Sequence, residues 1–274
     1  MKIKSSLHNH SAFDDGKSTI KEMVEAAIEL GFTDFGFSGH STNLDFFEGW
    51  GMTDEGGYID KVLKVKEAYK EKINIYLGLE QDLLGPTTRR DEYDYIIASV
   101  HGFTTPDGKK YYSVDDTLAE IKAGIDDVYN GDPYLMLEDY FANVVKNVKT
   151  FKPEIIGHFD LPVKLNGGND IFDEENERYV QAALNAVEKC IELGGIFEVN
   201  TGGIYRGYRD APYPAPFILK KILECGGRVM INADSHITTS IDYKFEESVE
   251  LIKEIGFKTV AVYLNGAFEN IAID

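Results

Sequence analysis

The sequence has little cysteine and little positive charge. Its two cysteines, Cys190 and Cys225, form no Cys-x-x-Cys spacing and are too few for a disulfide framework. We interpret both as buried small residues of a protein in a reducing compartment. Only 28 lysines and arginines stand against 47 aspartates and glutamates, a formal net charge of −19. Such a charge repels nucleic-acid phosphates and anionic membrane surfaces, and it keeps the protein soluble.

Long apolar runs are also absent. No stretch approaches the ~20 apolar residues that a membrane helix needs, and the N-terminal segment lacks the apolar core of a signal peptide. No low-complexity segment and no linker interrupts the chain. At 43% hydrophobic residues, a chain of this length can bury a large core. We therefore expect a cytoplasmic protein with one domain over residues 1–274 and no membrane or nucleic-acid partner.

A repeated pattern indicates a parallel sheet. Four times an amphipathic helix ends at glycine and a short apolar strand follows, at residues 31, 194–195, 226–227 and 256. Glycine after a helix adopts the left-handed conformation that turns the chain back toward a sheet. Helices that alternate with strands are typical of βα units.

The same reasoning places the elements along the whole chain. Strands are predicted near residues 3–7, 34–38, 73–79, 95–100, 155–157, 196–199, 229–231 and 259–263. Helices are predicted near residues 18–30, 57–72, 114–130, 133–151, 174–193, 215–225 and 245–255. Residues 43–56 and 202–216 are long for loops, so we expect them to flank a site.

Histidines follow the predicted strands. His8 and His10 close the first strand, where alternate side chains of an extended chain point the same way, about 6–7 Å apart. That spacing allows two imidazoles to hold one cation. The remaining histidines each follow a later strand: His40, His101, His158 and His236.

Two carboxylates accompany these histidines. Glu80 ends the third strand, and Asp234 lies between the seventh strand and His236. The carboxyl ends of parallel barrel strands meet at one mouth, where barrel enzymes place their active sites. Each residue alone is more often structural, as a capped or packed histidine or a salt-bridged acid. Together they exceed the four ligands of one zinc site and indicate two or three divalent metal ions, with Glu80 able to bridge two.

The ordered motifs resemble the polymerase and histidinol phosphatase (PHP) superfamily. The motifs are His8-Asn9-His10, Ser38-Gly39-His40, Gly78-Leu79-Glu80, Ser99-Val100-His101, Gly157-His158-Phe159-Asp160 and Asp234-Ser235-His236. The resemblance implies an α/β fold, a distorted (β/α)7 barrel with a trinuclear metal centre. Residues 197–207, followed by Pro212-Tyr213-Pro214, are most similar to the monofunctional histidinol-phosphate phosphatases of the superfamily.

The resemblance also implies a ligand set for each ion. The first ion takes His8, His10, Glu80 and Asp234. The second takes Glu80, His101 and His158, and the third takes Asp15, His40 and His236. Asp14 competes with Asp15 for the third ion. Because many members have Asp where this chain has Gly39, we expect the third ion to be held more weakly.

This centre predicts hydrolysis of a phosphate monoester. Cations lower the pKa of bound water from 15.7 to about 7, so that a metal-bridging hydroxide attacks phosphorus in line. Glu80, Asp234 and Arg206 are the predicted catalytic residues. A guanidinium matches two phosphate oxygens, so Arg206 is the first candidate for substrate binding, ahead of Arg209 and Lys164. For each of these three, the alternative is a surface cation in a weak ion pair.

We predict L-histidinol phosphate as the substrate, cleaved to L-histidinol and phosphate in histidine biosynthesis. Another small ester, a sugar or nucleotide phosphate, would use the same metal chemistry with a different pocket. An exonuclease would need a basic track for the nucleic-acid backbone, which the charge disfavours. A metal-binding or regulatory barrel without turnover is the non-enzymatic alternative. The ligand types suit Zn²⁺, Mn²⁺ and Fe²⁺ alike.

Overall fold

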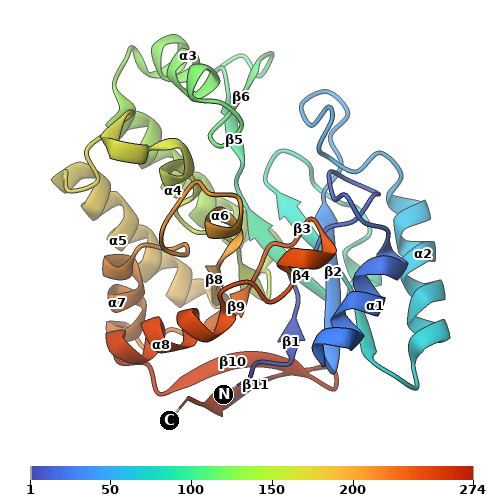
Figure 1. The fold of residues 1–274 in the computed structure, drawn as a ribbon. Helices are drawn as coiled ribbons and strands as arrows, with labels where there is room; N and C mark the ends of the chain where they lie inside the picture. Colours follow the sequence, from blue (N-terminus) through green and yellow to red (C-terminus); the bar gives the residue numbers. More distant parts are fainter. Residues whose placement is uncertain (1, 274) are drawn as a thin grey trace.

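The fold is built on one long, mostly parallel sheet. The computed structural model describes residues 2–273, so residues 1 and 274 of the predicted domain lie outside the described part. Within it, nine strands pair in the order β1-β2-β3-β4-β7-β8-β9-β10-β11 (Figure 1). Neighbours run parallel from β1 to β10, and β11 is antiparallel to β10.

The strands of this sheet alternate with helices along the chain. The strands are β1 (Ser5–Ser6), β2 (Asp34–His40), β3 (Asn74–Asp82), β4 (Tyr95–Ser99), β7 (Ile155–Ile156), β8 (Ile196–Asn200), β9 (Val229–Asn232), β10 (Thr259–Leu264) and β11 (Ala267–Ala272). The helices are α1 (Ile20–Leu30), α2 (Glu55–Tyr69), α3 (Leu118–Tyr129), α4 (Pro133–Phe151), α5 (Glu177–Leu193), α6 (Gly202–Tyr205), α7 (Pro216–Glu224) and α8 (Phe245–Ile255). A separate hairpin consists of β5 (Gly102–Thr104) and β6 (Tyr111–Ser113). Short 3-10 turns lie at η1 (Arg90–Glu92), η2 (Leu161–Leu165), η3 (Gly167–Asn169) and η4 (Thr238–Ser240).

Local sequence signals explain where α1 begins and ends. Thr19 accepts a hydrogen bond from the backbone of Glu22, whose side chain in turn accepts one from the backbone of Thr19, a capping box. The helix ends at Gly31 with φ of 82°, the left-handed conformation expected there. Its buried Met23 and Val24 belong to the main hydrophobic core, so capping and an apolar face together fix the helix.

The sheet curls until its first strand meets its last parallel strands. Just beyond β1, Asn9 forms a parallel bridge with Ser235. The backbone N–H of His10 donates to the carbonyl of Ser235 at 2.8 Å. At the opposite end, the N–H of Tyr263 donates to Ser5 Oγ at 3.1 Å. The predicted fold class, an α/β fold with a distorted (β/α)7 barrel, is confirmed.

Apolar side chains fill the barrel beneath the strand ends. Leu7, Tyr95 and Met230 belong to one buried cluster inside the sheet. Gly36 and Gly78 face the ring of Tyr95, which occupies the space that a side chain on either glycine would need. Tyr263 of β10 also belongs to this cluster, and Phe268 of β11 packs against it. Strands β10 and β11 cross the bottom of the view in Figure 1.

Most predicted elements are right, with instructive differences. Residues 114–117 are not helical, because the chain after β4 forms the hairpin β5–β6 before α3 begins. Glu80 does not end its strand: β3 continues to Asp82, because Gln81 and Asp82 pair with Ala98 and Ser99 of β4. Strand β11 was not predicted, and its residues are exposed or half-buried, without the apolar run that marks a buried strand. Within residues 2–273, no helix combines the length and apolar character that crossing a bilayer requires.

Candidate metal centre

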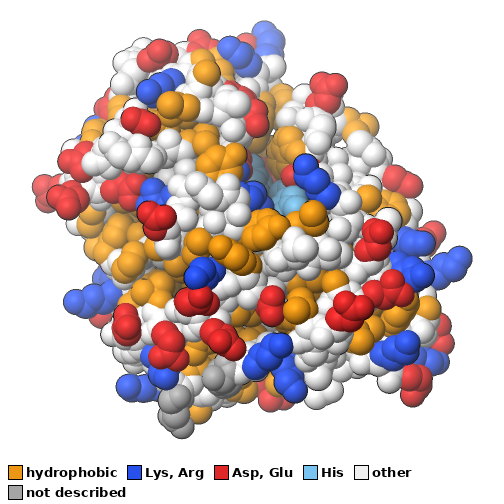
Figure 2. Space-filling model, in the orientation of Figure 1, with side chains coloured by type: hydrophobic (Ala, Val, Ile, Leu, Met, Phe, Trp, Pro, Cys, Tyr) orange, Lys and Arg blue, Asp and Glu red, His pale blue; other side chains and the backbone are white. Residues whose placement is uncertain are grey.

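The strand ends bring the histidines together in a hollow. His40 is the last residue of β2, and the others follow β1, β4, β7 and β9. Figure 2 shows histidine side chains, in pale blue, at the bottom of a hollow with lysine or arginine, in blue, beside them. Every histidine of the sequence therefore lies at one mouth, as the strand-end pattern predicts.

Glu80 lies at the centre of this cluster. Its carboxylate oxygens lie within 3.5 Å of ring nitrogens of five of the six histidines among the described residues. The distances are 2.8 Å to His40 Nδ1 and His158 Nε2, 3.4 Å to His8 Nε2 and His101 Nε2, and 3.5 Å to His10 Nε2. Burial opposes ionisation, but the nearby His8, His40 and His101 hold the pKa of Glu80 well below its usual value. An ionised carboxylate among imidazoles is suited to bridging two cations.

The inner group consists of His8, His10, Glu80 and Asp234. Asp234 Oδ1 lies 3.6 Å from His8 Nε2 and 3.2 Å from His10 Nε2. Both Nε2 atoms are buried and have no hydrogen-bond partner among the described residues. Buried polar atoms are rarely left unpaired, so these nitrogens fit ligands of a metal ion.

The second predicted set, Glu80, His101 and His158, also meets at one carboxylate. The ligand atoms of His40, Glu80 and His101 lie within 4.8 Å of one another. Those of His8, His158 and Asp234 form another such group. His158 also contacts the shared carboxylate directly: its Nε2 lies 2.8 Å from Glu80 Oε1.

The outer group consists of Asp15, His40 and His236. Asp15 Oδ1 lies 3.1 Å from His236 Nε2 and 3.6 Å from His40 Nε2. It is buried without a hydrogen-bond partner among the described residues. The competing candidate, Asp14, instead accepts a hydrogen bond from His10 Nδ1 at 2.8 Å. The geometry thus favours Asp15 over Asp14 as the third-site ligand.

Nitrogen and carboxylate oxygen ligands around unpaired buried atoms fit two or three divalent ions. Residues 6–202 match the family model described as PHP domain. The chain belongs to this family. The predicted resemblance is confirmed, and it covers the segment that contains the metal-site candidates from His8 to His158.

Relatives of this PHP-family chain match most or all of its length. A probable histidinol-phosphatase of Schizosaccharomyces pombe is 22% identical, over 100% of this chain and 95% of the relative. A probable histidinol-phosphatase of Deinococcus radiodurans is 26% identical, over 88% of this chain and 89% of the relative. A crystal structure of histidinol phosphate phosphatase from Lactococcus lactis, complexed with zinc, L-histidinol and phosphate, has a TM-score of 0.72 and 20% identity. It covers 98% of this chain and 100% of that chain.

Three carboxylates contact the Nδ1 atoms of His8, His10 and His101, on the side of each ring away from Nε2. Glu198 Oε1 lies 2.7 Å from His8 Nδ1, and Asp82 Oδ2 lies 3.2 Å from His101 Nδ1. Asp14 does the same for His10. Such contacts fix the ring and direct its other nitrogen at the metal position. Sequence reasoning missed Glu198 and Asp82 in this role, although a carboxylate between Phe197 and Val199 in an apolar strand is a usable signal.

Nearby carboxylates also favour protonation of His8 and His10. Burial disfavours the charged form of His10, but Asp14, Asp234 and Glu80 outweigh it and raise the pKa of His10 to about 10. The pKa of His8 is likewise raised, against burial, by Glu198, Glu80 and Asp234. Metal ions therefore compete with protons for these nitrogens.

The three basic side chains predicted to bind substrate have different ion-pair partners. Arg206 Nη2 lies 2.9 Å from Asp234 Oδ2, so its guanidinium borders the inner group. Its Nε is buried and unpaired among the described residues. Arg209 binds Glu174 through both terminal nitrogens, at 3.0 and 3.1 Å. Lys164 pairs with Asp115 at 2.8 Å.

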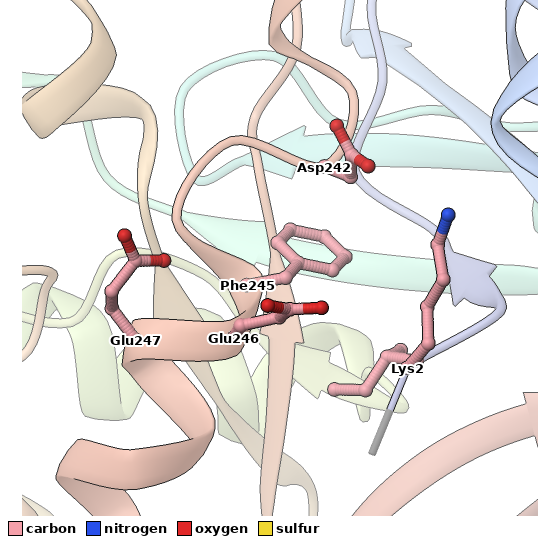
Figure 3. Close-up of a pocket in the computed structure, with 6 residues that line it drawn as sticks. Lys2, Asp242, Phe245, Glu246 and Glu247 are labelled. Atoms are coloured by element: carbon pink, nitrogen blue, oxygen red, sulfur yellow. The ribbon is translucent and has the colours of Figure 1, made fainter.

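A separate pocket lies between the N-terminal segment and α8. Figure 3 shows Lys2, Asp242, Phe245, Glu246 and Glu247 around it. None of the six histidines lines this pocket. Of the described groups of residues able to hold a metal ion, each includes a histidine from the strand ends. None of those groups includes a residue that lines this pocket.

Proposed function

We propose that this protein is a metal-dependent phosphomonoesterase that hydrolyses L-histidinol phosphate to L-histidinol and phosphate. The observation that carries the proposal is the buried Glu80 carboxylate ringed by histidines, with Asp234 and Asp15 beside them. The substrate is supported by two relatives named as probable histidinol-phosphatases. It is supported further by the related fold that holds zinc, L-histidinol and phosphate.

The proposed roles follow the position of each side chain. The proposed metal ligands are His8, His10, Asp15, His40, Glu80, His101, His158, Asp234 and His236. When bound, divalent ions neutralise phosphate oxygens and supply a nucleophile from water at neutral pH. Glu80 and Asp234 balance the charge of these ions. Because the carboxylates behind His8, His10 and His101 fix their rings, little reorganisation is needed on binding.

Arg206 is the proposed phosphate contact. Its side chain is 28% exposed, and its guanidinium lies against two proposed metal ligands, with Nη2 2.9 Å from Asp234 Oδ2 and Nη1 3.2 Å from His236 Nδ1. A charged donor at this position neutralises phosphate oxygens that the metal ions do not reach. Lys164 and Arg209 remain weaker candidates for substrate binding, because their carboxylate partners, Asp115 and Glu174, are not among the proposed metal ligands, whereas Asp234, the partner of Arg206, is.

The test is phosphate release by protein loaded with Zn²⁺ or Mn²⁺. L-histidinol phosphate is compared with sugar phosphates and nucleotides, and chelated protein is the control. We expect metal-dependent turnover with a preference of ~10³-fold or more in kcat/KM for L-histidinol phosphate, about 4 kcal/mol. Activity on other esters alone overturns the substrate, and inactivity of fully loaded protein overturns the enzymatic function.

A further inference from the structure

We infer that the indole of Trp50 forms one wall of the substrate pocket and stacks on a planar ring of the leaving group. The inference rests on the proposed function and adds to it the residue that recognises the imidazole of L-histidinol phosphate.

Trp50 lies directly against the metal centre. Its ring centroid is 4.8 Å from that of His40, nearly perpendicular to it, and 5.2 Å from that of His101. The side chain is half-buried, so one part packs on the two histidines and the rest is open to solvent. The indole therefore borders the place where a phosphate at the metal centre would carry its leaving group.

The loop that carries Trp50 is pinned in place. Phe47 is 2% exposed and lies 4.2 Å, centroid to centroid, from Trp50. Phe46 stacks on Tyr111 of β6 at 5.9 Å, and Asn43 Nδ2 donates to the carbonyl of Leu84 at 2.6 Å. These contacts tie the loop to the segments that follow β3 and β4. The indole is thus held ready before a ligand arrives, which lowers the entropic cost of binding.

The chemistry of an indole at this place selects the ligand class. A neutral aromatic face does not compete with the carboxylates for metal ions or with Arg206 for phosphate. It stacks on planar rings and attracts cations, and Trp does both more strongly than the other aromatic residues. Imidazole is planar, and its unperturbed pKa of about 6.5 leaves it partly protonated near neutral pH.

The first test uses two substrates that differ only by the ring. L-alaninol phosphate is L-histidinol phosphate with the imidazole removed. We expect Trp50→Ala to reduce the kcat/KM preference for L-histidinol phosphate over L-alaninol phosphate about tenfold, chiefly through KM, and Trp50→Phe to restore most of it. Phe46→Leu controls for the packing of the loop, and metal content is measured for each variant. An unchanged preference in metal-loaded Trp50→Ala overturns the inference.

The second test needs no variant and no turnover. Trp50 is the only tryptophan of the chain, so its fluorescence reports this wall alone. Titration of the metal-loaded protein with L-histidinol should change the emission, and titration with L-alaninol to the same concentration should not. If L-histidinol phosphate is hydrolysed but neither readout responds to the ring, the inference is wrong and the proposed function stands. If the emission responds but L-histidinol phosphate is not hydrolysed, the proposed function is wrong.

Discussion

The inner and outer groups of the metal centre are held differently. His8 and His10 are fully buried, and Glu198 and Asp14 grip the rear nitrogens of their rings. In the outer group, the side chains of His40, His236 and Asp15 are 8%, 19% and 34% exposed. The nearest partner of His236 Nδ1 is not a carboxylate but the backbone carbonyl oxygen of Asp234, at 2.9 Å. Buried, preorganised ligands bind more tightly than exposed ones, so the inner ion should be retained when the outer ion exchanges.

The largest effect is expected at Glu80, which belongs to the inner group and also contacts His40 of the outer group at 2.8 Å. Glu80→Gln removes the charge that the first and second proposed ions share, so kcat/KM should fall at least about 10³-fold, and fewer ions should remain bound. Steady-state kinetics and elemental analysis of the purified variant measure both. Glu71→Gln, at an exposed position, is the matched control. Near-normal activity in Glu80→Gln would remove Glu80 from the centre.

Next comes the arginine beside the inner group. Arg206→Ala removes a charged hydrogen-bond donor from the proposed phosphate position, so KM for L-histidinol phosphate should rise about 10- to 100-fold. Arg206→Lys keeps the charge without the planar fork and should lie in between. A KM equal to that of the natural protein in both variants would exclude Arg206 from phosphate binding.

Variants of the adjacent residues Asp14 and Asp15 test whether the inner and outer groups bind separate ions. Asp14→Asn disturbs the contact behind His10 and should weaken binding of the inner ion about 10- to 100-fold. Asp15→Asn removes an outer ligand and should lower the metal content by one ion while the inner ion keeps its affinity. Competition with a chromophoric chelator measures both. Identical profiles for the two variants would mean that inner and outer groups do not bind separate ions.

The smallest effect is expected at Arg209. Because its guanidinium is bound to Glu174 and to the carbonyl of Val163, Arg209→Ala should lower the free energy of unfolding by about 1 kcal/mol. KM should stay within twofold of its original value. Urea unfolding and kinetics give the two numbers; a tenfold rise in KM would place Arg209 in substrate binding, as the sequence suggested.

The sequence predicts the proposed metal ligands better than the residues that contact those ligands. Strand ends in a parallel barrel converge, so the position of His101 or His236 after a strand is enough to bring it to the mouth. Glu198 holds His8 from a strand far along the chain, and that contact depends on side-chain directions across the sheet. The hairpin β5–β6 was not predicted, although Pro106-Asp107-Gly108 between its two strands is a turn signal. Trp50 lay in a loop expected to flank a site, but its contact with two histidines required the fold.

The most direct test of the account is anomalous diffraction from crystals grown with Mn²⁺. We predict the strongest anomalous peak within about 2.0–2.4 Å of the Nε2 atoms of His8 and His10 and of the carboxylate of Glu80. A weaker peak should lie between Asp15, His40 and His236. Strong binding of Mn²⁺ elsewhere, with no peak at Glu80, would contradict the metal centre on which the proposed function depends.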